Sequence, residues 1–406
     1  MDRVLGIIAE YNPFHNGHLY HLRESKAVCG ADTTVVAVMS GDFVQRGEPA
    51  LLHKWARADM AVRQGVDLVL ELPFVYACNN AEYFARGALR ILNGLNCVDD
   101  LSFGSETGDT EKLRSAAYLF AENGEVLNMR VREGMASGLS YPKARQNAAE
   151  TLAGSDAAAV LGAPNDILAV EYLKQLILLN SSIKPIIIKR YAAGPTDVNA
   201  ECSIAGATAI RDMLLCGEAD RASDYLPADV WTSMRSYADE GGRLLSAADL
   251  RTLLIYAVLS ADGARLSEIL SATEGLENRL IRAARRGRDM AEIVRFTKTK
   301  RYTQTRIKRL IIHTMMGLTK QDMRAIDAGG IYGRVLAFSD RGAKLIRRVK
   351  KTEGAIPLIT NPNRERTALS DCALMSAFDR KAADVRKLAE DGCLGGFCDL
   401  KCNPKR

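Results

Sequence analysis

The sequence predicts an α/β protein in which a parallel β-sheet occupies the first half and the second half is mainly helical. Short segments rich in Val, Ile and Leu alternate with helix-like segments in the first half, which is typical of a parallel sheet covered by helices. After residue 211 the strand signals largely disappear. The 406 residues are enough for two domains. We therefore expect a Rossmann-like domain over residues 1–220 and a mainly helical domain over residues 221–406.

Each element of the first half has its own signal. Strands are predicted at residues 4–9, 33–39, 67–72, 98–103 and 184–189, and helices at residues 18–27, 54–64 and 81–92. The strand at 33–39 is nearly continuous in apolar residues, as expected when both faces of a strand are covered. Between residues 110 and 180 the pattern is helical, and Pro164-Asn165 introduces an amphipathic helix at 166–179. We expect this region to be a helical insertion in the first domain.

The composition excludes several classes of protein. With 47% hydrophobic and 26% charged residues, the chain is neither wholly disordered nor a repetitive fibre. No apolar run approaches the ~20 residues needed to cross a bilayer, and the N-terminus lacks a basic leader. We therefore expect a cytoplasmic protein with no membrane partner.

The nine cysteines lack paired CxxC spacing, so reduced thiols are expected. Cys393, Cys398 and Cys402 lie close together near the C-terminus, and a metal site with Cys372 as fourth ligand is one alternative. Their spacing matches no zinc-finger pattern, however. We predict no metal site and expect a loosely ordered tail.

The most informative segment is 6–18, Gly-Ile-Ile-Ala-Glu-Tyr-Asn-Pro-Phe-His-Asn-Gly-His, because three of the five histidines, His15, His18 and His21, lie within seven residues. The segment follows the first strand, so it lies at the carboxyl edge of the sheet, where open α/β folds bind ligands. A helix is expected to start near His18, and its free N–H groups and dipole favour an anion. Gly17 lets a phosphate approach the backbone closely.

Two imidazoles beside such an anion can donate hydrogen bonds to phosphate oxygens while the α-phosphorus is attacked. We therefore predict that His15 and His18 are catalytic residues of an ATP site. A helix cap or a structural metal site is the alternative for these histidines. The metal alternative is weaker because no carboxylate or thiolate completes the ligand set.

A second segment supports a phosphate site. Residues 203–211, Ser-Ile-Ala-Gly-Ala-Thr-Ala-Ile-Arg, place small residues at a helix start, with Arg211 three positions after Thr208. The segment resembles the ISSTxIR element of adenylyltransferases, which implies that Thr208 and Arg211 bind the β and γ phosphates, although the segment is also an ordinary helix start. Gln45, Arg46 and Lys54, which follow the second strand, are candidates near the phosphates or a second substrate, with a solvated loop as the alternative.

The positive charge is concentrated in the second half. The chain has a net charge of +6, but residues 279–309 hold twelve Lys or Arg against Asp289 and Glu292, a local charge of +10 that leaves −4 for the rest. Helices are expected at residues 247–260, 266–285, 289–296 and 303–316.

Within this basic region, segment 296–309 combines cations with hydroxyls and aromatic residues, and Tyr302 could stack on an unpaired base. A solvated helix face is the alternative. The predicted RNA-binding residues are Lys298, Lys300, Arg301, Tyr302, Arg306, Lys308 and Arg309.

Taken together, the motifs resemble HIGH-type nucleotidyltransferases and, more closely, the tRNA(Met) cytidine acetate ligase (TmcAL) family. The resemblance runs over most of the chain through AEYNPFHNGHLYHL, VMSGDFVQRGEPALLHKWARADMA, GVDLVLELP, FARGA, FGSE, PNDILAVEY, SIAGATAIR and FTKTKRYTQTRIKRL. Segment 203–211 departs from the ISSTxIR pattern of these enzymes, since Ala205 and Gly206 stand where serines are common.

The resemblance implies an enzyme that activates acetate with ATP to acetyl-adenylate and acetylates the wobble cytidine of elongator tRNA(Met). Mg²⁺ is expected to accompany the ATP, and the oligomeric state stays open. Gly104, Asn165 and Arg190 are implied to complete the ATP pocket. The residues of the histidine motif that are implied to line the ATP pocket are Ile8, Ala9, Glu10, Tyr11, Asn12, Pro13, Phe14, His15, Asn16, Gly17, His18, Leu19, Tyr20 and His21.

Two other functions are compatible with parts of the sequence. A small-molecule adenylyltransferase acting on nicotinate mononucleotide or pantetheine phosphate would explain the histidine motif but gives the basic helical half no task. A noncatalytic RNA-binding protein would explain the basic half, but both histidines and Gly17 are present, which argues against it.

Overall fold

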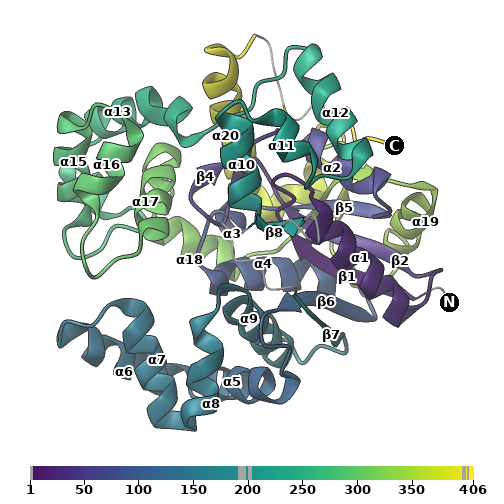
Figure 1. Cartoon of the computed structure of the whole chain (residues 1–406), viewed down its shortest axis with the longest axis horizontal. Helices are drawn as coiled ribbons and strands as arrows, with labels where there is room; N and C mark the ends of the chain where they lie inside the picture. Colours follow the sequence, from purple (N-terminus) through teal and green to yellow (C-terminus); the bar gives the residue numbers. More distant parts are fainter. Residues whose placement is uncertain (1–2, 191–197, 200–203, 396–398, 400–401) are drawn as a thin grey trace.

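The computed structural model describes residues 3–190, 198–199, 204–395, 399 and 402–406. Its centre is a seven-stranded sheet in the order β11-β10-β5-β2-β1-β6-β7 (Figure 1). All neighbouring strands are parallel except β10 and β5, which are antiparallel. The strands are β1 (Val4–Ala9), β2 (Thr34–Ser40), β5 (Leu68–Leu72), β6 (Asp100–Ser105), β7 (Lys184–Lys189), β10 (Gly333–Phe338) and β11 (Leu358–Ile359). The α/β class and the five strands of the first half are therefore as predicted, within two residues at each end.

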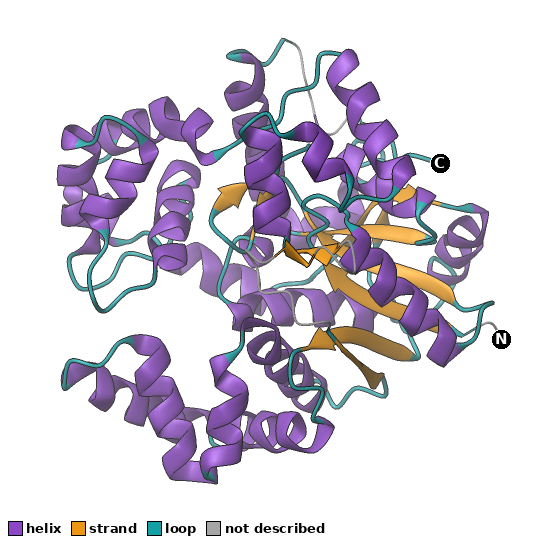
Figure 2. Ribbon diagram, viewed as in Figure 1, coloured by secondary structure: helices purple, strands orange, loops and turns teal. Residues whose placement is uncertain are grey.

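Helices cover both faces of the sheet, as Figure 2 shows. Successive residues of a strand point to opposite faces, so Val36 and Val38 of β2 join one hydrophobic core and Val35 and Ala37 join the other. This two-sided burial explains the continuous apolar runs in the sequence. The covering helices include α1 (Asn16–Cys29), α2 (Lys54–Arg63), α4 (Ala81–Gly94), α9 (Pro164–Leu178), α10 (Ala207–Leu215), α12 (Ala228–Asp239) and α19 (Asp340–Val349).

The predicted helical insertion forms a separate lobe between β6 and β7 (Figure 1, lower left). Helix α5 packs on α9, which joins the lobe to the sheet, while α6 and α7 pack on each other. The helices of this insertion lobe are α5 (Thr110–Glu122), α6 (Gly124–Ala136), α7 (Tyr141–Ala153) and α8 (Ser155–Ala159).

A second helical lobe, the basic lobe, carries most of the region of high positive charge (Figure 1, green helices). The helix expected at 266–285 is two helices, because Glu274 and Gly275 adopt positive φ angles of 52° and 77° between them. The helices here are α13 (Arg251–Ser260), α14 (Gly263–Ser267), α15 (Leu276–Arg286), α16 (Met290–Thr297), α17 (Gln304–Met316) and α18 (Lys320–Ala328).

The chain then returns to the sheet, which the sequence analysis did not anticipate. Strand β10 pairs antiparallel with β5, and β11 pairs with β10. Helix α20 (Ala373–Asp391) follows and packs on α3 (Phe74–Ala77). Residues 221–406 are mainly helical but supply two strands of the central sheet, and the division of the chain near residue 220 stays a prediction. Among the described residues, no helix combines the length and apolar character needed to span a membrane.

Candidate active site

The histidine motif lies where β1 gives way to α1, at the carboxyl edge of the sheet. After Ala9 the chain turns through Tyr11, with a φ of 45°, and a cis Asn12-Pro13 peptide bond. Helix α1 begins at Asn16, two residues before the predicted start, and His15 is its N-cap. The turn therefore places His15 and His18 on the first helical turn, beside the free N–H groups of the helix.

The two histidines hold each other in one orientation. The Gly17 N–H donates to His15 Nδ1 at 3.1 Å, and the His15 N–H donates to His18 Nδ1 at 3.3 Å. The rings stack with their centroids 3.8 Å apart. Because each Nδ1 accepts a hydrogen bond, a neutral ring carries its proton on Nε2. Each imidazole thus keeps one N–H donor for a ligand.

Both rings are neutral at pH 7. Burial, together with the charges of the nearby Arg190 and Arg211, lowers the pKa of His15 to about 3. Burial, and then His15, hold the pKa of His18 well below its ordinary value. An Nε2–H donor that stays neutral can stabilise charge developing on a phosphate oxygen without losing a proton to it.

His21 has a different task from the other two histidines. Its Nε2 lies 3.0 Å from the Ser102 hydroxyl, which contacts the Ser25 hydroxyl at 2.7 Å, and Ser25 donates to the His21 carbonyl at 2.6 Å. This closed cycle of hydrogen bonds holds α1 against β6. The contact of His21 with nucleotide stays a prediction, and Ser102 is a partner that the sequence analysis missed.

The FGSE and PND motifs meet across the end of β6. The Glu106 carboxylate accepts from the Asn165 side chain at 2.5 Å and from the Asp166 N–H at 2.9 Å, and so caps α9. In return, buried Asp166 accepts from the Glu106 N–H at 2.9 Å and from the Ser105 hydroxyl. These reciprocal hydrogen bonds between Glu106 and the start of α9 fix the position of Asn165. Neither Glu106 nor Asp166 was among the predicted site residues.

Gly104 leaves room for Arg190. A Cβ at position 104 would lie 2.9 Å from Arg190 Cγ, so any larger residue would push the guanidinium away from the site. Arg190 directly follows β7, and its charge acts on His15, His18 and His21. The structure therefore brings these two predicted pocket residues to the same edge as the histidine motif.

The second predicted phosphate segment meets the first. Residues 200–203 lie outside the described part of the chain, but α10 starts at Ala207 with no side chain capping its first N–H groups. Arg211 donates to the Asn12 carbonyl at 3.0 Å and to the Thr208 hydroxyl at 3.2 Å. An N-terminus with uncapped N–H groups and a cation thus faces the histidine motif, which is an arrangement suited to a polyphosphate.

Comparison with known proteins gives the family of the chain. The chain matches the HIGH Nucleotidyl Transferase family over residues 2–393. It is 39% identical to the tRNA(Met) cytidine acetate ligase of Alkaliphilus metalliredigens, covering 95% of this chain and 94% of the relative. The ligase of Bacillus subtilis is 37% identical and is matched over 88% and 87% of the two chains. This chain belongs to the tRNA(Met) cytidine acetate ligase family.

Solved structures agree with this assignment. Thermotoga maritima TmcAL without ligand superposes with a TM-score of 0.92 at 32% identity, covering 99% of each chain. The same protein bound with alpha-thio ATP gives a TM-score of 0.90. The Rossmann-like nucleotidyltransferase fold predicted from the sequence is therefore confirmed.

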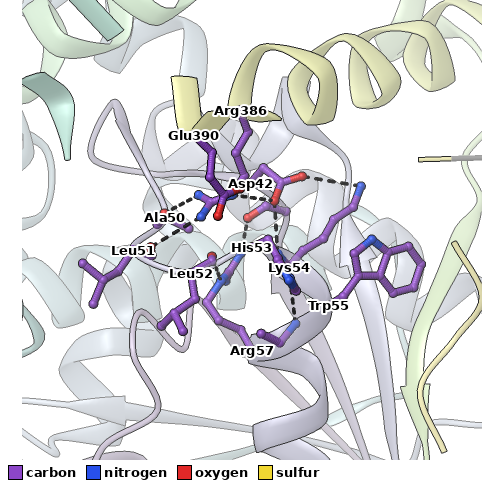
Figure 3. Close-up of polar contacts among 12 residues, drawn as sticks. Asp42, Ala50, Leu51, Leu52, His53, Lys54, Trp55, Arg57, Arg386 and Glu390 are labelled. Carbon is purple, nitrogen blue, oxygen red and sulfur yellow. Dashed lines mark hydrogen bonds and ion pairs between the residues drawn. The ribbon is translucent and has the colours of Figure 1, made fainter. Parts of the chain in front are cut away.

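Against this ligase fold, the prediction for Lys54 is wrong. Its side chain is 1% exposed and its ammonium forms ion pairs with Glu71 at 2.9 Å and Asp399 at 3.0 Å. Burial alone would lower the pKa of Lys54, but these carboxylates and Asp42 raise it above its ordinary value. Figure 3 shows Asp42 between the side chains of Lys54 and Arg386 of α20. Lys54 therefore holds the C-terminal segment in place and cannot reach a substrate.

The loop after β2, which includes β3 (Phe43–Val44) and β4 (Glu48–Pro49), does lie beside the site. The Gln45 N–H donates to Glu10 Oε1 at 2.7 Å, and the Glu48 carboxylate lies 3.9 Å from Arg211. Arg46 is half-buried in the same loop. Glu48 was missed in the sequence, because only the fold shows that it lies next to a phosphate-site cation.

Four of the seven predicted RNA-binding residues point elsewhere. Tyr302 is 5% exposed and donates to Glu274, so its ring is not available to a base, and Arg306 lies over that ring at 4.6 Å. Lys308 forms an ion pair with Glu48, and Arg309 donates to the Gln45 carbonyl at 2.8 Å. Lys308 and Arg309 thus contact the loop after β2, whereas Tyr302 and Arg306 make their contacts inside the basic lobe, with Glu274 and Thr273.

The remaining three predicted RNA-binding residues, Lys298, Lys300 and Arg301, are exposed in the segment between α16 and α17. The C-terminal cysteines add no site that can be described. Cys398 lies outside the described residues, Cys372 is buried and Cys393 is exposed.

Proposed function

We propose that this protein uses ATP to activate acetate and then acetylates the wobble cytidine of elongator tRNA(Met) in the cytoplasm. The observation that carries the proposal is the stacked His15–His18 pair, with both Nε2–H groups free for phosphate at the N-terminus of α1. The ligase relatives and the Thermotoga protein bound with alpha-thio ATP support it.

In the first step, an acetate oxygen attacks the α-phosphorus of ATP and the bond to pyrophosphate breaks. Negative charge grows on the phosphate oxygens, where the Nε2–H groups of His15 and His18 can donate. Arg211 and the first turn of α10 are placed to hold the β and γ phosphates of the leaving group. Asn165 in the first turn of α9 and Arg190 directly after β7 would complete the ATP pocket.

In the second step, the exocyclic amine of the cytidine attacks the acyl carbon of acetyl-adenylate, and AMP leaves. The amine is a weak nucleophile, so a reactive mixed anhydride held away from water suits the task. Glu10 and Gln45 lie on the side of the site that faces the basic lobe, through Arg309. This side is where the RNA would enter.

Mg²⁺ is expected to accompany ATP. No group of three or more His, Cys, Asp or Glu among the described residues could hold a metal ion. The ion would be held chiefly by phosphate oxygens and water, as is usual for Mg²⁺ with nucleotides. We therefore assign no step of the reaction to it.

The test is to measure pyrophosphate release from labelled ATP before any tRNA is added. Acetate should stimulate release, whereas nicotinate mononucleotide and pantetheine phosphate should not. Stimulation by a phosphorylated acceptor in place of acetate would support the small-molecule adenylyltransferase, and no release with any acceptor would leave only binding.

A variant separates the two half-reactions. His18→Ala should abolish acetate-dependent release and leave tRNA affinity nearly unchanged, because it removes only a phosphate donor. Removing the charges of Lys300 and Arg301 should do the reverse. Equal loss of both activities in either variant would contradict this division.

A further inference from the structure

A shallow hollow lies between the two helical lobes. Its volume is about 690 Å³, with Ser140 and Pro142 of the insertion lobe on one side and Arg295 and residues 298–303 of the basic lobe on the other. These segments are about 150 residues apart in the sequence, yet Figure 1 shows both lobes on the same side of the sheet. The hollow is distinct from the ATP site at the β1–α1 junction.

The basic side of the hollow is built to attract a polyanion. Four cations line it, Arg295, Lys298, Lys300 and Arg301, and no carboxylate does. Arg295 and Arg301 form ion pairs with nearby glutamates but are still 68% and 49% exposed. Neither Lys298 nor Lys300 has an ion-pair partner in the described part of the chain. Such a surface favours phosphates over a neutral or apolar partner.

The insertion side supplies what the basic side lacks. Ser140 and Pro142 line the hollow from this side. Tyr141, between them, is 43% exposed, and Lys143, which follows Pro142, is exposed as well, so both lie at the rim of the hollow and not among its lining residues. Tyr302, the aromatic residue of the basic side, is buried and cannot receive a base. An exposed aromatic ring beside cations is the usual means of holding an unpaired base and its phosphate.

We propose that a single-stranded segment of the tRNA passes between the two lobes, so that the insertion lobe is half of the RNA-binding surface. Lys298 and Lys300 contact its phosphates from one side and Lys143 from the other, while Tyr141 stacks on an unpaired base. This inference rests on the proposed function, since it takes tRNA as the partner. It gives the insertion, which contributes nothing to the ATP site beyond the start of α9, a role of its own.

The experiment uses the full-length protein and measures the Kd for unmodified elongator tRNA(Met) over a series of salt concentrations. Tyr141→Ala should raise the Kd about fivefold or more, because the loss of one stacked base costs at least about 1 kcal/mol. Tyr141→Phe keeps the ring and should bind normally. Lys143→Glu should weaken binding and lower the slope of log K against log salt by about one. The matched control is Tyr118→Ala, since Tyr118 is 52% exposed on α5 of the same lobe and, unlike Tyr141, has no lining residue beside it in the sequence.

A fifth variant, Lys300→Ala, removes one cation of the basic side and should also weaken tRNA binding. Acetate-dependent pyrophosphate release without tRNA is measured on the same samples and should be unchanged in all five variants, which also shows that they are folded. The inference is overturned if Tyr141→Ala and Lys143→Glu bind tRNA as tightly as the unchanged protein while Lys300→Ala does not. It is also overturned if Tyr118→Ala weakens binding as much as Tyr141→Ala. Failure of the proposed function would look different, as absence of acetate-dependent release in the unchanged protein.

Discussion

The carboxylate of Glu48 forms an ion pair with the ammonium of Lys308, and this contact joins the loop beside the ATP motif to α17 of the basic lobe. The same carboxylate lies 3.9 Å from Arg211, the cation of the second phosphate segment. Next to it, Arg309 holds the Gln45 carbonyl, and the Gln45 N–H binds Glu10. A continuous set of polar contacts thus runs from the basic lobe to both walls of the ATP site.

Lys308→Met should therefore weaken ATP use although Lys308 lies in the basic segment. Without the ammonium, Glu48 pairs with Arg211 alone and competes with phosphate for it. We expect the KM for ATP to rise about threefold, since a partly exposed ion pair is worth about 0.2–1 kcal/mol. Pyrophosphate release measures this, and Lys300→Met serves as the control that should affect tRNA affinity alone. A normal KM for ATP with weakened tRNA binding would return Lys308 to the RNA surface.

Gly47→Ala should disrupt the same junction. Gly47 has a φ of +74°, and a Cβ there would lie 2.4 Å from the Arg309 backbone nitrogen. Backbone strain of about 1–3 kcal/mol is then added to displacement of α17. Urea unfolding and pyrophosphate release should both show a loss. The control is Gly138→Ala, where φ is +98° but no heavy atom lies within 4 Å, so only strain remains. Equal losses of stability and of pyrophosphate release in the two variants would show that the close contact between Gly47 and α17 contributes to neither.

Tyr302 should behave as a core residue. Tyr302→Phe loses the hydrogen bond to Glu274, so we expect about 1 kcal/mol of lost stability and normal tRNA affinity. Tyr302→Ala leaves a cavity and should cost about 3 kcal/mol or more. Thermal or urea unfolding measures both variants. If Tyr302→Ala kept its stability and lost tRNA binding, the ring would be stacking on a base after all.

The stability of the protein should fall as the pH is lowered from about 6.5 toward 4. Burial lowers the pKa of His15 to about 3 and those of His21, His53 and His313 to about 4, and His18 is lowered as well. Below pH 6.5 the unfolded chain takes up protons that the folded chain refuses. Each histidine then lowers the free energy of unfolding by about 1.4 kcal/mol per pH unit, between its pKa in the unfolded chain and its lower pKa in the folded protein.

Glu71 opposes this trend, because burial raises its pKa to about 7. As the pH falls, the folded protein therefore takes up a proton at Glu71 before the unfolded chain does, and this uptake stabilises the folded state. One carboxyl offsets about one of the five histidines, so the net direction is unchanged. Urea unfolding at pH 8, 7, 6 and 5 checks the prediction. Stability should be nearly constant between pH 8 and 7 and then decrease, and an unchanged midpoint at pH 5 would contradict it.

The elements that the sequence predicted well are those whose signal is local. The strand at Thr34–Ser40 is a long β-branched run, and the turn at Asn12-Pro13 with Gly17 fixes the start of α1 to within two residues. Strand β10 was missed because its six residues, Gly-Arg-Val-Leu-Ala-Phe, carry a cation at Arg334. Only its distant partner Asp399 makes that burial possible.

The same limit applies to the site. The histidine motif, Thr208 and Arg211 were identified as site candidates because their residue types and spacing suit phosphate. Glu48, which lies beside Arg211, and Asp166, which binds the end of β6, carry no such pattern. A charged residue in a sequence does not reveal its partner, and for that reason Lys54 and Lys308 were both assigned to substrates when they bind carboxylates of the protein.

The pairing of β10 with β5 also has a consequence for biosynthesis. Strand β5 is complete at residue 72, but its outer backbone groups find their partner only when residue 338 has been made. A nascent chain therefore carries an unpaired sheet edge for most of its translation, and such edges invite association with other chains. Premature termination between α10 and β10 would release a nucleotide-binding half with that edge still exposed.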